Sequence, residues 1–208
     1  HPEWQPQLAS LETESACVLA DWAAVRALVS QAHSVPELAM ARALLAMREG
    51  DAGAVDAALR DARRQLGAPL LGPGHVAYAH AYDAVTHLHM LCELELVFRG
   101  QATDDVLRAR LAATLPSFRT REPVLSVRRS AMLACSAASD VSAALGASWM
   151  ASAKVARQAG HTQSAYSAVL QAQQHGAPFA FVQQAKLLAL ADQRQGDLPK
   201  QRQNTRPA

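Results

Sequence analysis

Four histidines near the middle of the chain are the residues with the clearest potential for chemistry: His75, His80, His87 and His89. If this stretch is helical, His80, Asp83 and His87 share one helix face, because they are spaced by three and four residues. Such a face could hold a divalent metal ion. The stretch lacks paired cysteines and an HExxH core, which make a zinc site specific. We therefore favour histidines at the edge of packed faces and expect no metal.

Motifs for group transfer are not found in the sequence. Phosphoryl transfer needs a glycine-rich phosphate loop, a lysine that bridges phosphates, and acidic or amide residues that hold magnesium. The stretch 72–74 (Gly-Pro-Gly) is too short for such a loop, and its proline restricts the backbone. The only lysines in the sequence are Lys154, Lys186 and Lys200. The GxSxG elbow of acyl transfer is also missing. We expect neither catalytic residues nor a cofactor in this chain.

The densest basic cluster consists of Arg119, Arg121, Arg128 and Arg129. Aromatic residues that could stack on bases do not interleave with it, and acidic residues such as Glu122 lie close by. The pattern favours solvated arginines and ion pairs, with one arginine pairing with Glu122 or another acid. The net charge of +2 is small, and no apolar run reaches the roughly 20 residues of a membrane span. We expect no direct nucleic-acid partner and no membrane partner.

Composition indicates an all-α protein. Half of the 208 residues are hydrophobic but only 5% are aromatic, and alanine and leucine dominate, as in closely packed helices. Cys17, Cys92 and Cys135 are odd in number, far apart and set among apolar residues, so we expect buried thiols in a reducing, intracellular compartment.

The elements that position these residues follow from hydrophobic spacings of three and four. The first helix carries the apolar stripe Leu8, Leu11 and Val18. A long, central helix is expected over about 76–98, and Pro123 suits the first turn of a later one. The other expected helices lie near 22–29, 38–45, 55–66 and 107–115, with three more that begin near 148, 162 and 178.

Three predicted turns show the same downstream pattern, which indicates an internal repeat. Small and apolar residues recur at offsets of five, nine and twelve from the turn residue. The three sets are Ala20, Val25, Val29, Ala32; Gly50, Val55, Leu59, Ala62; and Gly160, Ala165, Val169, Ala172. A proline (Pro36, Pro69 or Pro178) closes each unit, and in the third, Trp149 and Ala153 precede the turn at tetratricopeptide-like positions.

The repeat predicts an α-solenoid of tetratricopeptide-like helical hairpins, with Trp149, Tyr166, Val169 and Tyr82 in the core. A generic alanine-rich bundle is the alternative. We expect the helical-repeat domain to span 1–191 and 192–208 to form a disordered polar tail, since that tail cannot bury a further helix.

Three stretches resemble the FAT domain of ATR-like kinases, within the phosphatidylinositol 3-kinase-related kinase family. They are 87–95 (HLHMLCELE), 119–129 (RTREPVLSVRR) and 149–166 (WMASAKVARQAGHTQSAY), and the opening HPEW also fits. The resemblance covers about residues 1–188. After Leu188 the chain departs from the family pattern, and we expect it to be a fragment of a longer polypeptide.

The resemblance implies a non-catalytic scaffold in a nuclear serine/threonine protein kinase of the DNA damage and replication stress checkpoint. The implied partners are the kinase domain and neighbouring solenoid of the same chain and, through the parent, an ATR-interacting protein. The alternative is a free-standing helical-repeat adaptor whose groove binds a peptide from a partner protein.

Overall fold

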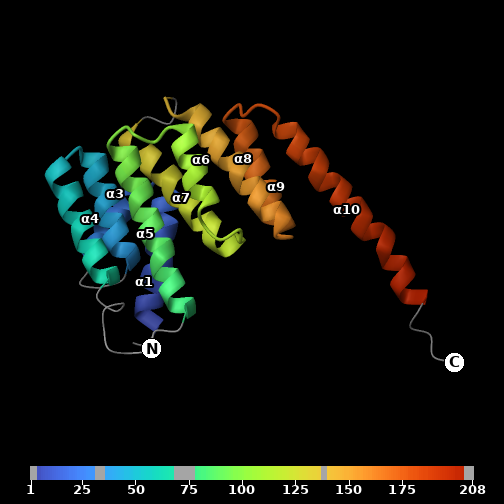
Figure 1. The fold of residues 1–208 in the computed structure, drawn as a ribbon, viewed down its shortest axis with the longest axis horizontal. Coiled ribbons are helices and arrows are strands. Elements are labelled where there is room, and N and C mark those ends of the chain that lie inside the picture. The colour runs from blue at the N-terminus through green and yellow to red at the C-terminus, as the bar shows by residue number, and fades with distance from the viewer. Residues whose placement is uncertain (1–3, 31–35, 68–77, 137–139, 204–208) are drawn as a thin grey trace. The chain divides into compact units, whose positions relative to one another are not determined.

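The computed structural model describes residues 4–30, 36–67, 78–136 and 140–203, and it divides the chain into two compact units, His1–Val141 and Ser142–Ala208. All regular elements in the described ranges are helices, which confirms the predicted all-α fold class (Figure 1). Within those ranges, no helix is both long and apolar enough to cross a membrane.

The first unit contains α1 to α7. Their bounds are α1 (Gln5–Val18), α2 (Trp22–Val29), α3 (Pro36–Glu49), α4 (Ala52–Gly67), α5 (Tyr78–Phe98), α6 (Asp104–Ala112) and α7 (Phe118–Cys135). Asp21, Asp51, Thr103 and Ser117 each accept a hydrogen bond from a backbone N–H in the first turn of α2, α4, α6 and α7, respectively. These caps satisfy donors that a helix leaves unpaired at its N-terminus.

Helix α3 is the centre of the first unit. Its residues 38–41 and 43–47 are all buried, and α1, α2, α4, α5 and α7 pack around it. A helix that is apolar on all sides must be enclosed by others. The expected central helix was the one near 76–98, but α5 leaves Val85 and Leu88 exposed and is buried on one side only. Central position therefore belongs to α3, which five other helices of the unit contact.

Helix α1 buries the face opposite to the one we predicted. Ala9, Thr13 and Ala16 are buried, while Leu8 and Leu11 remain more than half exposed. Small side chains let the backbone of α1 approach its neighbours, and the Ser130 hydroxyl of α7 donates a hydrogen bond to the Cys17 carbonyl at 3.0 Å. The prediction of a buried leucine stripe on this helix is wrong, because spacing alone does not tell which face a core accepts.

Two further expectations need correction. Pro123 lies inside α7, which begins at Phe118 after the Ser117 cap, and not in its first turn. Of the three cysteines, which are all free, Cys17 is buried as predicted, Cys92 is half-buried and Cys135 is exposed. Cys135 is the last residue of α7, where a side chain has fewer neighbours than in the middle of a helix.

The second unit contains α8 (Ser142–Gln158), α9 (Thr162–Gln174) and α10 (Ala180–Gln203). Helix α8 begins before the expected start near residue 148 and forms a hairpin with α9, to which the Ser142 hydroxyl and the His175 ring add a contact of 3.2 Å. Ala180 and Leu187 of α10 are buried against α8 and α9. The boundary predicted at residue 191 lies inside α10, and 204–208 lie outside the described residues.

Candidate functional site

No group of three or more His, Cys, Asp or Glu side chains in the described part of the chain could hold a metal ion, but the predicted set of His80, Asp83 and His87 is incomplete there and stays untested. His75 and the side chain of His80 lie outside the described residues. The His87 ring contacts the Asp83 carbonyl through Nδ1 at 2.8 Å, and its Nε2 lies 3.7 Å from Oε1 of Glu37 on α3. Nδ1 of His89 lies 3.4 Å from Nη2 of Arg110. His87 and His89 therefore serve contacts between helices.

The contact between His87 and Glu37 changes the protonation of both side chains. The interaction with Glu37 raises the pKa of His87 above 6.5, against the effect of burial, and the interaction with His87 lowers the pKa of Glu37 below 4.5. Attraction between opposite charges favours both ionised forms. The pair thus links α3 and α5 electrostatically when the imidazole is protonated.

A buried carboxylate, Glu93 of α5, joins three helices. Its Oε2 accepts a hydrogen bond from Nε of Arg128 on α7 at 2.9 Å, and its Oε1 lies 3.4 Å from Nε of Arg110 on α6. Arg128 also donates from Nη2 to the Leu107 carbonyl at 3.2 Å. A charge withdrawn from water needs such compensation. Because both carboxylate oxygens face guanidinium groups, Glu93 holds helices together and is not poised to act as a base.

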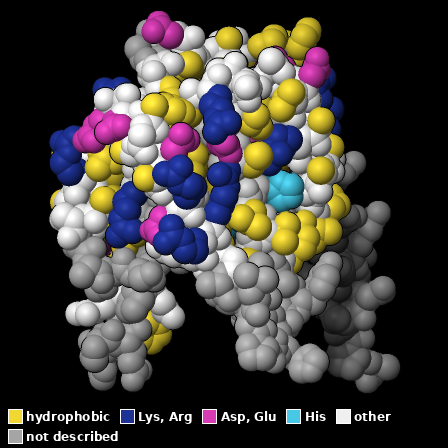
Figure 2. Space-filling model, turned by 60° about the vertical axis from the view of Figure 1, so that its left-hand side comes forward, with side chains coloured by type: hydrophobic (Ala, Val, Ile, Leu, Met, Phe, Trp, Pro, Cys, Tyr) yellow, Lys and Arg dark blue, Asp and Glu magenta, His cyan; other side chains and the backbone are white. Residues whose placement is uncertain are grey.

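The basic cluster consists largely of ion pairs, as predicted. Arg129, next to Arg128 but on another side of α7, lies 2.8 Å from Oε1 of Glu122, which confirms the expected pairing with that acid. Burial lowers the pKa of the Arg129 guanidinium, and the Glu122 carboxylate opposes this effect. The exposed Arg119 lies 3.5 Å from Asp83. On the face shown in Figure 2, Lys and Arg side chains gather with acidic side chains among them.

Sequence reasoning missed Glu93 and Arg110 as members of this network. Glu93 stands in the apolar stretch 90–94, where a charged residue is expected to have a buried partner, and this signal could have marked it. Nothing in the sequence could have identified the partner, because Arg128 is 35 residues away.

The predicted repeat positions occupy comparable places in their hairpins. The turn residues Ala20, Gly50 and Gly160 all have positive φ values, of 54°, 74° and 81°. The downstream positions Val25, Val55, Leu59, Ala62, Ala165, Val169 and Ala172 are buried, as is Ala153, whereas Val29 is only half-buried. Trp149, Tyr166 and Tyr82 are only half-buried. Ala32 and Pro69 lie outside the described residues, and the assignment to a tetratricopeptide-like repeat stays a prediction.

A cleft of about 930 Å³ opens in the first unit between α1, α3, α5 and α7. Apolar side chains from all four helices line it, together with several carboxylates, and its volume falls within the range of about 300 to 1,000 Å³ typical of ligand pockets. Two of the acidic side chains that line the cleft are paired within the chain, Glu37 with His87 and Asp83 with Arg119.

Comparison with known proteins shows which family the chain resembles. The model of the FAT domain family matches residues 9–206, which extends beyond residue 188, where we expected a departure. Serine/threonine-protein kinase ATR of Arabidopsis thaliana is 35% identical over 167 residues, which cover 72% of this chain and 6% of that protein. The ATR kinases of Oryza sativa subspecies indica and japonica are each 31% identical over 170 residues, 73% of this chain. The chain spans only 6% of the length of these relatives.

Proposed function

The chain belongs to the FAT domain family as a segment of an ATR-like kinase, and on this premise we propose that it supports the kinase domain of a nuclear protein kinase that signals DNA damage and replication stress. Its partners are then the kinase domain and neighbouring helices of the same polypeptide and, through the parent, an ATR-interacting protein. The segment transmits conformational state through packed hairpins and takes no part in the chemistry.

The observation that carries the proposal is the FAT match over residues 9–206 of a chain whose buried charges connect helices. Glu93 links α5, α6 and α7, and the Glu37 contact with His87 links α3 and α5. A support must resist deformation, and ion pairs between buried side chains of different helices make the position of each helix depend on the others. This is the property expected of a support element.

A free-standing adaptor is the second candidate, and the cleft in the first unit favours it because a peptide-binding adaptor needs such a surface. Sequencing full-length transcripts separates the two candidates. A downstream kinase domain with an Asp-Phe-Gly magnesium motif supports the scaffold. A stop codon after Ala208 in every transcript contradicts it and favours the adaptor.

The functional test is made in the intact kinase polypeptide. Val169→Asp places a charge at a buried position of α9, and Leu170→Asp places the same charge at a neighbouring exposed position. After replication stress, we expect the first variant to lose kinase activity per molecule of immunoprecipitated protein, and the second to retain it. Equal, undiminished activity of both variants would show that the kinase does not depend on this segment.

A further inference from the structure

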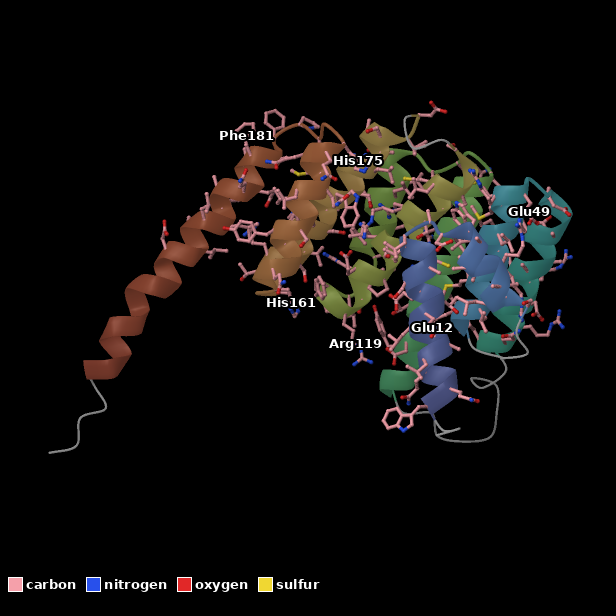
Figure 3. The ribbon with its side chains drawn as sticks, turned by 180° about the vertical axis from the view of Figure 1, so that it is seen from behind. Glu12, Glu49, Arg119, His161, His175 and Phe181 are labelled. Atoms are coloured by element: carbon pink, nitrogen blue, oxygen red, sulfur yellow. The ribbon has the colours of Figure 1, made fainter. Side chains whose placement is uncertain are left out.

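The connection between α9 and α10 contains a strained backbone position. Phe179, the residue before α10, adopts φ 61°, in the left-handed region that is costly for an L-amino acid with a bulky side chain. Gly176, three residues earlier, adopts φ 65°, where a glycine carries no such cost. Figure 3 shows His175 and Phe181 on either side of this joint. The joint therefore contains two left-handed residues, of which only the glycine is relaxed.

Packing of the side chain does not explain the conformation of Phe179. Its side chain is 68% exposed, and its ring contacts that of Phe181, which is 63% exposed, with 6.2 Å between the ring centroids. Strained conformations persist where the surrounding structure imposes them. The Phe179 carbonyl accepts a hydrogen bond from the Val182 N–H at 2.9 Å, in the first turn of α10. The strain thus belongs to the way in which the chain enters α10.

Helix α10 packs on the hairpin of α8 and α9 through a small contact. Among its described side chains, at 180–190 and 192, Ala180 and Leu187 are the buried ones. The Gln183 and Gln184 side chains each accept one hydrogen bond, from α8 and α9, at 3.2 and 3.0 Å, respectively. Farther along, α10 runs away from both helices (Figures 1 and 3). Little buried surface therefore opposes its separation from the hairpin.

The two helices of the hairpin are joined more closely. A Cβ on Gly146 of α8 would lie 3.1 Å from the Cβ of Ala177, which follows α9, so the helices approach closely at this end. Four residues of α9 are buried: Ala165, Ala168, Val169 and Ala172. The free energy needed to open part of a protein rises with the buried contacts that opening breaks. The hairpin should therefore stay closed under conditions in which α10 separates from it.

We propose that Phe179 is a hinge at which α10 docks on the α8–α9 hairpin and undocks from it while the hairpin stays folded. In the docked state Ala180 and Leu187 are buried and the backbone of Phe179 is strained. Undocking exposes the two side chains and releases the strain, so the strain lowers the free energy of opening. This hinge goes beyond the proposed scaffold function, because it locates the point at which the segment changes shape.

Native-state hydrogen exchange, followed by mass spectrometry of peptides, tests the hinge in the chain and in the intact kinase polypeptide. An undocked helix is only marginally stable in water, so its amides exchange. We expect amides of 184–190 to exchange about tenfold or more faster than amides of 165–172, which are released only when the hairpin opens. Equal protection of the two stretches in either sample would overturn the proposal, including the case in which other parts of the parent hold α10 in place.

Two substitutions at the hinge isolate the strain. Phe179→Gly and Phe179→Ala both remove the ring, but only the alanine keeps the Cβ that makes the left-handed conformation costly. We expect amides of 184–190 to exchange about twofold to fivefold more slowly in the glycine variant than in the alanine variant, after the larger entropy of the free glycine is taken into account. Exchange that is equal in both variants, or faster with glycine, would show that Phe179 is not a strained hinge.

A second pair of substitutions tests whether α10 opens alone. Leu187 is 1% exposed and Leu188 is 53% exposed. We expect Leu187→Ala to accelerate exchange at 184–190 about tenfold or more and to leave 165–172 unchanged, while Leu188→Ala changes neither stretch. Alanine is as good a helix former as leucine, so the comparison reports packing. Acceleration of both stretches by the same factor in Leu187→Ala would show that α10 opens only together with the hairpin, and would overturn the proposal.

Discussion

Nε of Arg128 lies 2.9 Å from Oε2 of Glu93, and both side chains are almost completely buried. The two residues belong to different helices, α7 and α5, and Arg110 of α6 approaches the other carboxylate oxygen. Because neither Glu93 nor Arg128 has access to bulk water, each depends on the other for compensation of its charge.

Removing one member of this network should therefore be costly. We expect Glu93→Ala to lower the free energy of unfolding by about 3 to 5 kcal/mol, since it leaves buried guanidinium groups without their carboxylate. Urea unfolding followed by circular dichroism measures the change. Asp105→Ala is the control, because Asp105 forms an ion pair with Arg108 on the exposed surface and should contribute less than about 1 kcal/mol. Equal effects of the two substitutions would contradict the role assigned to Glu93.

Neighbouring positions of α9 provide a matched test of its packing. Val169 is 1% exposed and Leu170 is 55% exposed. We expect Val169→Asp to destabilise the second unit by about 3 kcal/mol or more, because an unpaired carboxylate would be buried, whereas Leu170→Asp should change stability little. Thermal melts compare the two variants. An unchanged melting temperature for Val169→Asp would refute the packing of α9 described above.

The turn residues predict a reciprocal pair of substitutions. Ala20 adopts φ 54°, a left-handed conformation that costs an L-amino acid about 1 to 2 kcal/mol, while Gly50 adopts φ 74° at the equivalent turn. We expect Ala20→Gly to stabilise the chain by about 0.5 to 1 kcal/mol. This gain is smaller than the cost of the left-handed conformation, because glycine has a larger conformational entropy than alanine in the unfolded chain. Gly50→Ala should destabilise it by a similar amount, since a Cβ there would meet nothing within 4 Å and only the backbone is strained. Chemical denaturation measures both, and changes of the same sign would argue against the shared turn geometry.

The contact between His87 and Glu37 makes stability depend on pH. The raised pKa of His87 adds stability that is present below its unfolded value of 6.5 and is lost as the pH rises through the folded value. The lowered pKa of Glu37 adds stability that is present above 4.5 and is lost as the pH falls through its folded value. The ionic attraction between Glu37 and His87 is therefore strongest at pH values above the pKa of Glu37 and below the pKa of His87 in the folded chain.

It follows that His87→Gln should destabilise the chain more at about pH 5.5 than at about pH 8.5. Unfolding curves of the wild type, His87→Gln, Glu37→Gln and the double variant at both pH values measure the interaction as a double-mutant cycle. A coupling energy that does not fall between the lower and the higher pH would exclude an ionic contribution from this pair.

The cysteines should differ in reactivity toward a thiol reagent under native conditions. Burial raises the pKa of Cys17 to about 12, so little of the reactive thiolate forms near neutral pH, and the side chain is also shielded. Cys135 is exposed, and we expect it to react first. Cys17 should react only after denaturant is added. Mass spectrometry of labelled peptides follows the order, and rapid native labelling of Cys17 would contradict its burial in the core.

Local patterns in the sequence determined much of the fold. Spacings of three and four residues located the helices, and the offsets from Ala20, Gly50 and Gly160 identified turns that share a positive φ. Such features depend on residues close together in the chain, where backbone geometry relates type and spacing directly to structure. The sequence also identified the family, which the match to the FAT domain model confirms.

The tertiary structure decided which faces are buried and which charges meet. On α1 the core accepts Ala9, Thr13 and Ala16 and leaves Leu8 and Leu11 in solvent. Periodicity is the same for both faces of a helix, so only packing against other helices distinguishes them. The partner of Arg128 could not be predicted for the same reason, because α5 and α7 meet only in the folded chain. The cleft has its walls on four helices and therefore exists only in the tertiary structure.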